Sequence, residues 1–466
     1  MVSIRAGLTR NNNTVSPSMA FLPCIFYLLS ILTVPTLSFG QGAGPADSLP
    51  SFTLQQCVDY ALQHQPMVNQ AFINQQITRA SNAIALSGWL PQVNVTGNLT
   101  HYNTLPTVFV KDPSGNITEQ KTGVINTAIP ILSVSQTIFN PALLFAAKSA
   151  PLYVNQSEQI TDSTKIGAVA NVSKSFYSLL LTIEQIAVLE EDTARLGKNL
   201  RDTYHQYVSG IVDETDYDEA AISLNNSKAQ LKQAMENVVP QYATLKQVMG
   251  YPPQQHFNVS YDTSQMLRDI FFDTTQTLQY EKRIEYQQLE TSKKIQGQLV
   301  NYYRKAWLPT LNAFFDYDYE FQNNDFGNLF SNAYPYSYVG LSLSLPVFTG
   351  FARTKSVQKA RLQAQLLDWD EIALRSQIYT EYTTSLANYK SNLYNLEEMR
   401  DNVALARKVY DIVALQYVQG VVAYLNVITA ESNLITSEIG YLNALFQLLS
   451  SKIDLEKSMG YITVTH

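Results

Sequence analysis

The sequence predicts an α+β membrane protein in which long α-helical coiled coils are joined to four β-strands per chain. Three observations predict this class. The chain repeats itself, each copy contains two segments with the two-residue period of strands, and each copy contains long segments with a helical period.

The duplication is visible in short sequences that return in the same order. The stretch "SGWLPQVNV" at 87–95 returns as "KAWLPTLNA" at 305–313, and "QYVSGIV" at 206–212 returns as "QYVQGVV" at 416–422. Self-similarity of this kind indicates a repeated architecture. The expected organisation is a first repeat at 41–250, a linker at 251–272, a second repeat at 273–461 and a C-terminal tail at 462–466.

Residues 1–40 are typical of a secretory signal peptide. Arg5 and Arg10 precede an apolar run at 20–37, and the small-residue site 38–40 follows it. Cys57 is then the remaining cysteine, so we expect an exported chain that is held together by packing and not by disulfides. The net charge of −7 and the lack of a basic run exclude a nucleic-acid partner.

Each repeat is expected to contain a β-hairpin, at about 91–139 and about 309–348, after a helical stretch at 52–87 or 274–305. Proline cannot continue a helix, so Pro91 and Pro309, with the nearby Trp89 and Trp307, mark helix-to-strand junctions. Beyond each proline apolar and polar residues alternate, as in an outer-membrane barrel wall or in the half-buried sheet of a soluble protein. The signal peptide and the aromatic residues at strand ends favour the membrane; these are Tyr102, Tyr317, Tyr319, Phe321, Tyr334, Tyr336 and Tyr338.

Four strands are too few to close a barrel. Membrane barrels start at about eight strands, and an open strand edge in lipid leaves backbone groups unpaired at several kcal/mol each. Two chains would supply eight strands and a filled barrel, whereas three would supply twelve and leave a passage. A homotrimer in outer-membrane lipid is therefore expected.

Two long helices are expected at about 142–207 and 352–417, and each would extend roughly 100 Å. Each is interrupted at a glycine, Gly210 or Gly420, after which a second helix returns. The returning helices carry apolar residues at a seven-residue spacing, which predicts coiled-coil packing. These residues are Tyr217, Leu224, Leu231, Val238 and Leu245, and Val427, Leu434, Tyr441, Leu448 and Leu455.

This ordered and duplicated set of segments resembles the TolC family of outer-membrane efflux proteins. The resemblance rests on the repeated "WLP" stretches, on "PVFTGFARTK", on "YVSGIVDETDYDEA" with "YVQGVVAYLNVITAES", and on the closing "LKQVMG" and "LEKSMG". It implies a twelve-stranded trimeric barrel in the cell outer membrane, continued by a helical barrel that extends into the periplasm. It also implies a passive exit duct of a tripartite efflux or type I secretion system, with a periplasmic adaptor (membrane fusion) protein and an inner-membrane pump of the RND, ABC or MFS type.

The resemblance also assigns roles to residues. The helix tips that dock the adaptor map onto Val208, Gly210, Ile211, Val418, Gly420 and Val421, although glycines there also suit simple helix ends. A periplasmic gate of acidic side chains maps onto Asp401 and Asp411, with Arg407 as a partner; a solvated helix face is the alternative. The cargo stays open, because drugs, metal ions and secreted proteins are all carried by the family.

Three acidic residues lie in one predicted strand, Asp316, Asp318 and Glu320, and they would favour cations if they face the lumen. The five histidines are scattered without metal spacing, and no catalytic, cofactor or metal motif is present. The sequence therefore predicts a channel and not an enzyme. The alternative is a trimeric, membrane-anchored coiled-coil stalk without transport activity, which would not conduct ions.

Overall fold

The computed structural model describes residues 50–111, 113–261 and 263–463, and the expected signal peptide lies outside these residues. The first repeat consists of α1 (Leu54–His64), α2 (Pro66–Leu86), β2 (Gln92–His101), β5 (Asn126–Phe139), α3 (Pro141–Val208) and α4 (Glu214–Met249). The second repeat consists of α6 (Ile284–Lys305), β7 (Thr310–Asn323), β8 (Ala333–Ser344), α7 (Ala352–Val418) and α8 (Tyr424–Met459).

Two of the expected helical stretches differ from the structure. The stretch at 52–87 is split into α1 and α2, because Pro66 cannot continue α1 and instead opens α2 as a first-turn proline. The stretch at 274–305 becomes a helix only at Ile284, after a 3-10 turn at Tyr280–Lys282.

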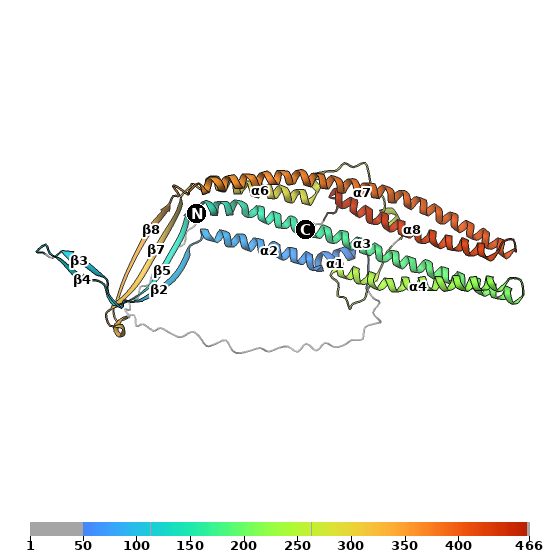
Figure 1. The fold of residues 1–466 in the computed structure, drawn as a ribbon, viewed down its shortest axis with the longest axis horizontal. Helices are drawn as coiled ribbons and strands as arrows, with labels where there is room; N and C mark the ends of the chain where they lie inside the picture. Colours follow the sequence, from blue (N-terminus) through green and yellow to red (C-terminus); the bar gives the residue numbers. More distant parts are fainter. Residues whose placement is uncertain (1–49, 112, 262, 464–466) are drawn as a thin grey trace, which may run out of the picture. The chain divides into compact units, whose positions relative to one another are not determined.

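The four long strands form one antiparallel sheet in the order β2-β5-β7-β8 (Figure 1). Each repeat contributes one hairpin, and β5 of the first repeat pairs with β7 of the second. Within the described residues, β2 and β8 each pair with one neighbour in this sheet. Both edges of the sheet are therefore open in a single chain.

The strand register separates an apolar face of this sheet from a polar face. Phe315 is paired with Val339, and the next residue, Asp316, is paired with Tyr338. Directly paired residues point to the same side of a sheet, and successive residues alternate sides. The apolar face carries Val93, Val95, Leu132, Val134, Phe315, Tyr317, Val339, Leu341 and Leu343. The polar face carries Asn94, Thr96, Ser133, Ser135, Asp316, Asp318, Glu320, Tyr334, Tyr336, Tyr338 and Ser342.

The tyrosines of β8 correct one expectation. Tyr334, Tyr336 and Tyr338 were expected to join Tyr317 and Tyr319 as interface aromatics, but the two sets lie on opposite faces. The β8 tyrosines are paired with acidic residues of β7, which places them on the polar face. Alternation along one strand does not show which residues of the neighbouring strand lie on the same face. The register between the two strands decides this.

The loop of the first hairpin contains a ribbon that the sequence pattern did not indicate. β3 (Thr107–Lys111) and β4 (Ile117–Lys121) form a separate antiparallel pair, and every residue of both strands is exposed. This ribbon accounts for the longer loop of the first repeat.

The long helices pair as two hairpins, α3 with α4 and α7 with α8 (Figure 1). α3 also packs against α8, so the two repeats share a core. Leu224, Leu434 and Leu448 of the seven-residue repeats are buried, and each such side chain stabilises the fold by about 1.5–3 kcal/mol. At the start of α3, the Asn140 side chain accepts a hydrogen bond from the backbone N–H of Ala142 and caps the helix.

The expected linker is packed into the core. β6 (Asn258–Val259) pairs in parallel with β1 (Ser51–Phe52), and a short helix, α5 (Thr263–Asp269), follows. Phe257 and Ile270 are buried, and the Tyr389 hydroxyl of α7 donates a 2.8 Å hydrogen bond to the Ile270 carbonyl. The segment between the repeats thus binds the two helical hairpins to each other.

Among the described residues, one helix, Pro141–Val208, is long and apolar enough to cross a membrane by length and composition, because one 18-residue window of it has a mean hydropathy of 1.3. Half of its apolar window is buried inside the protein, as in a core helix. Cys57 is fully buried, and burial raises the pKa of its thiol to about 12. This cysteine packs as a small apolar side chain.

Candidate functional site

The two helix tips have the same backbone geometry. At the end of α3, Gly210 has a φ of +72°, its N–H donates to Tyr207 O, and the N–H of Ile211 donates to Gln206 O. At the end of α7, Gly420 has a φ of +75°. Its N–H donates to Tyr417 O, and the N–H of Val421 donates to Gln416 O. This is a Schellman turn, which requires a left-handed residue and therefore favours glycine.

Both tips present apolar side chains to solvent. Ile211 is 73% exposed and Val421 is 67% exposed, and Val208 and Val418 are exposed beside them. A side chain built at either tip glycine would meet no atom within 4 Å. The glycines are therefore required for the turn conformation, and the surface around them is free to contact another molecule.

The two tips are tied to each other by a bond that sequence reasoning missed. The hydroxyl of Tyr417 on α7 donates a 2.7 Å hydrogen bond to Oε1 of Gln206 on α3. The pair Gln-Tyr stands before the tip turn in both repeats, at 206–207 and 416–417, which is the signal that could have pointed to it.

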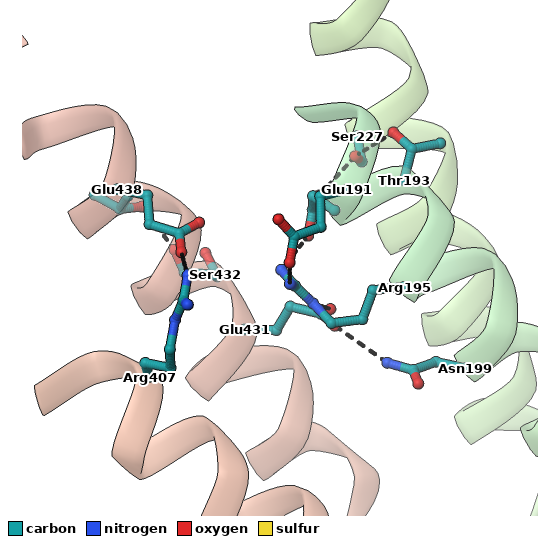
Figure 2. Close-up of polar contacts among 11 residues, drawn as sticks. Glu191, Thr193, Arg195, Asn199, Ser227, Arg407, Glu431, Ser432 and Glu438 are labelled. Carbon is teal, nitrogen blue, oxygen red and sulfur yellow. Dashed lines mark hydrogen bonds and ion pairs between the residues drawn. The ribbon is translucent and has the colours of Figure 1, made fainter. Parts of the chain in front are cut away.

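A buried set of charged and polar side chains lies farther along the hairpins. We call it the Arg195 network; it consists of Asp192, Arg195 and Asn199 on α3, Ser227 on α4 and Glu431 on α8 (Figure 2). Arg195 lies 13 residues before the end of α3 at Val208, which corresponds to roughly 20 Å along the helix.

Arg195 is the centre of this network. Its Nε donates to Oε1 of Glu431 at 2.8 Å, and its guanidinium also donates to Oδ1 of Asp192 at 2.9 Å. The same guanidinium stacks over the ring of Tyr410 on α7, 5.2 Å from its centroid. The other Asp192 oxygen accepts a 2.6 Å hydrogen bond from Ser227. One arginine thus contacts residues of α3, α7 and α8, and α4 joins through Ser227.

The two carboxylates of the network are almost completely shielded from water, whereas the Arg195 side chain is 20% exposed. The side chains of Asp192 and Glu431 are 1% and 2% exposed. Burial raises the pKa of both carboxyl groups, and the hydrogen bonds from Ser227 or Arg195 oppose that rise. Burial would lower the pKa of Arg195, but the hydrogen bond and charge of Glu431 raise it on balance. Two carboxylates share one guanidinium, so the single positive charge does not neutralise both of them. Hydrogen bonds from neighbouring side chains therefore also stabilise the carboxylates.

Glu431 carries a signal in the sequence that could have been read. It lies four residues after Val427 and three residues before Leu434, so it falls on the apolar stripe of α8. A charged residue at this spacing interrupts the apolar pattern. A charge on a buried stripe requires a partner. The partner comes from α3, more than two hundred residues away, and no spacing rule identifies it.

The predicted gate residues are not brought together. Arg407 on α7 donates to Oε1 of Glu438 on α8 at 2.6 Å, so Asp401 and Asp411 are not its partners (Figure 2). Asp401 is exposed and lies 3.5 Å from its neighbour Arg400, and Asp411 is also exposed. Within the single chain the α7–α8 contact thus gives Arg407 a carboxylate from the opposite helix, and the expected gate of Asp401, Asp411 and Arg407 stays a prediction.

The junction residues lie where the helices change into strands. Pro91 and Pro309 directly precede β2 and β7. Trp89 ends a 3-10 turn and is half-buried, whereas Trp307 is 55% exposed. Within a single chain, the junction tryptophan of the first repeat is therefore more buried than that of the second.

The acidic residues of β7 share the polar face of the sheet. Asp316 is paired with Tyr338, Asp318 with Tyr336 and Glu320 with Tyr334. Asp318 is 3% exposed, and its Oδ2 accepts no hydrogen bond within the described part of the chain. Among the described residues, no group of three or more His, Cys, Asp or Glu side chains could hold a metal ion.

A sheet with one apolar face, joined to two long helical hairpins that end in exposed tips, is also the fold of several solved outer-membrane channels. The chain belongs to the outer membrane efflux protein family, whose sequence model matches residues 57–251 and 287–461. It is an outer-membrane efflux channel protein, and the predicted fold class, function class and outer-membrane location are confirmed at this level.

Individual relatives are distant in sequence but similar in fold. The outer membrane protein TolC of Vibrio cholerae is 18% identical over 382 residues, which cover 81% of this chain and 83% of that protein. The outer membrane protein VceC from the same organism has a TM-score of 0.68 at 15% identity, with 87% of this chain and 96% of that chain covered. The MtrE outer membrane channel of Neisseria gonorrhoeae has a TM-score of 0.67 at 16% identity, with 87% and 88% covered.

Proposed function

We propose that three copies of this chain form the exit duct of a tripartite efflux or type I secretion system. The observation that carries this proposal is the four-stranded sheet with one apolar face and two open edges. Val339, Leu341 and Leu343 on that face are 67–78% exposed in the single chain. Apolar side chains of this kind are stable against lipid, and the open edges require partners of the same kind.

The number of copies follows from the edges. If β8 of one chain pairs with β2 of the next, three chains of four strands close a twelve-stranded barrel. The closed ring satisfies the backbone groups of every edge strand, and its polar faces line a passage. The helical hairpins of the three chains then continue this passage into the periplasm.

Disulfide cross-linking between edge strands tests the assembly. A variant that carries one cysteine on β2, at Val93 or Val95, and one on β8, at Leu341 or Leu343, is expected to yield covalent dimers and trimers on mild oxidation, because the two edges meet between chains in the proposed barrel. A cysteine at Val134 on the central strand β5 serves as the control and is expected to stay monomeric. The same purified protein is expected to conduct ions in planar bilayers. An SDS-resistant trimer that never conducts would contradict the duct.

The tips are the proposed docking surface for a periplasmic adaptor protein, which links the duct to an inner-membrane pump. Ile211 and Val421 present apolar side chains on two turns of the same geometry, which suits a partner that contacts both repeats alike. The double variant Ile211→Glu, Val421→Glu is expected to lose adaptor binding in a pull-down while its conductance is kept. Adaptor binding at wild-type strength would contradict this assignment. Photo-cross-linking from positions 210 and 420 would identify the adaptor.

We further propose that polar contacts between helices hold the duct narrow at its periplasmic end. Arg195 with Glu431 and Tyr417 with Gln206 join the two helical hairpins, and Arg407 with Glu438 joins the helices of the second hairpin. Glu431→Gln is expected to raise single-channel conductance, because it weakens the bond between α3 and α8. The variant Glu236→Gln, at an exposed pair on α4 alone, is the matched control. Equal conductance in both variants would show that these contacts do not restrict the opening.

A further inference from the structure

Three acidic residues on β7 and three tyrosines on β8 form a regular arrangement on the polar face of the sheet. We call it the acid–tyrosine ladder; its rungs are Asp316 with Tyr338, Asp318 with Tyr336 and Glu320 with Tyr334. Directly paired side chains in an antiparallel sheet have Cβ atoms about 4.5–5.5 Å apart. Each carboxylate is therefore within reach of a phenol ring, and successive rungs are roughly 7 Å apart along the strands.

The ladder lacks a positive charge of its own. Among the described residues, no Lys or Arg side chain forms an ion pair with Asp316, Asp318 or Glu320. Asp316 is bonded to the Tyr338 hydroxyl, whereas Oδ2 of the buried Asp318 has no hydrogen-bond partner within the described chain. Buried carboxylates are normally paired with a cation or fully hydrogen-bonded. This oxygen is closed to solvent in the single chain, so a cation from outside reaches the Asp318 carboxylate only when the half-exposed tyrosine rings beside it move aside.

The geometry favours an organic cation over a metal ion. A single Ca²⁺ binds oxygens at 2.3–2.6 Å, and rungs about 7 Å apart cannot direct three carboxylates to one such ion. No metal-binding group of acidic side chains occurs in the described residues. An alkylammonium group matches the ladder better, because the carboxylate attracts its charge and the faces of the tyrosines attract its polarised C–H groups.

We propose that the acid–tyrosine ladder is a binding site for organic ammonium cations with an apolar body on the polar face of the sheet. The assignment rests on the proposed duct, since the polar face must line its passage. Tyr334, Tyr336 and Tyr338 are each about half exposed, at 48–49%, and present ring surface to a passing molecule. Weak binding at three successive rungs would let a cation move from rung to rung and leave, as conduction requires.

Reversible block of the purified channel in planar bilayers by benzyltrimethylammonium tests the ladder. Asp318→Asn is expected to weaken the block about ten-fold, because it removes the closest unpaired charge. Tyr336→Leu is expected to weaken it about five-fold without a change of charge, whereas Tyr336→Phe keeps the ring and is expected to keep the block. Glu119→Gln on the exposed ribbon strand β4 removes one carboxylate elsewhere and is expected to leave the block unchanged.

The outcomes separate the ladder from the duct. Conductance with a benzyltrimethylammonium block that none of the ladder variants changes would overturn the ladder and leave the duct standing. A block that weakens equally in Asp318→Asn and Glu119→Gln would also overturn it, because only the overall charge would then matter. If the protein does not conduct, the proposed duct is contradicted, but calorimetric titration of the detergent-solubilised protein with benzyltrimethylammonium still tests binding to the ladder. Loss of the heat of binding in Tyr336→Leu would support the ladder. The absence of any heat of binding in the wild-type protein would overturn it.

Discussion

The Arg195 network and the acid–tyrosine ladder both contain buried carboxylates, but the two places differ in how completely the carboxylate oxygens are hydrogen-bonded. Asp192 and Glu431 are bonded to Arg195 and to neighbouring hydroxyl or amide groups. Asp318 is almost as deeply buried, yet one of its oxygens has no partner in the described chain. The paired carboxylates stabilise the contact between helices, whereas the unpaired oxygen of Asp318 would gain an attractive interaction from a cation that reaches it. The difference predicts that substitutions in the two places change different properties.

The largest expected effect is loss of stability on removal of the arginine. Arg195→Met leaves two buried carboxylates without a cation, and breaking a buried pair in this way costs about 3–5 kcal/mol. Thermal unfolding followed by far-ultraviolet circular dichroism measures it. Arg79→Met removes the exposed pair with Glu158 and is expected to cost less than about 1 kcal/mol. Equal losses in both variants would mean that the network contributes no more than a surface pair.

The pH dependence of stability is the second expected effect. Asp192 and Glu431 have pKa values raised above their ordinary 3.8 and 4.5, so the native protein binds more protons than the unfolded chain in the window above those values. Their contribution to stability is therefore full below the ordinary pKa values and is lost as the pH rises through the raised ones. Asp192→Asn is expected to flatten this decline of the unfolding midpoint as the pH rises above 3.8, the ordinary pKa of the carboxyl group. An unchanged pH profile would contradict the raised pKa of Asp192.

The ladder is expected to respond in selectivity and not in stability. Asp316→Asn with Asp318→Asn removes two of the three ladder carboxylates of each chain and is expected to lower cation selectivity. The measurement is the reversal potential in a salt gradient, which should move toward zero while the unfolding midpoint falls little. An unchanged reversal potential would mean that these side chains do not face the passage.

The smallest expected effect concerns the long bond at the edge of the Arg195 network. Asn199 donates to Oε2 of Glu431 at 3.4 Å, near the limit for a hydrogen bond. Asn199→Ala is therefore expected to cost less than about 1 kcal/mol in the same unfolding assay. A loss as large as that of Arg195→Met would show that the amide, and not the guanidinium, holds Glu431.

Much of the architecture was predictable because it depends on local periodicity. The long helices, the prolines before β2 and β7 and the tip glycines follow from spacing and from backbone preferences that act within a few residues. The ribbon of β3 and β4 was not predictable, because its short exposed strands lack an apolar face. The packed linker was missed for a related reason, since Phe257 and Ile270 are buried by helices distant in the sequence.

Among the charged residues, too, some positions could be predicted from the sequence and their partners could not. Asp316, Asp318 and Glu320 could be found from the sequence, because alternation places acidic residues on one side of a strand. Their tyrosine partners could not, because the register between β7 and β8 decides which side each tyrosine shares. Arg407 was expected beside Asp401 and Asp411, but its partner within the single chain, Glu438, comes from the returning helix, which no spacing in the sequence indicates.

The sequence by itself determined the duplication, the order of helices and strands and the positions of the turns, because each of these depends on neighbours along the chain. Only the tertiary structure decided that Arg195 meets Glu431, that the β8 tyrosines face the acids, and that an oxygen of the buried Asp318 has no hydrogen-bond partner in the described part of the chain. Contacts between segments two hundred residues apart depend on how helices and strands pack. That packing is set by the sum of many weak interactions, and no single spacing in the sequence records it.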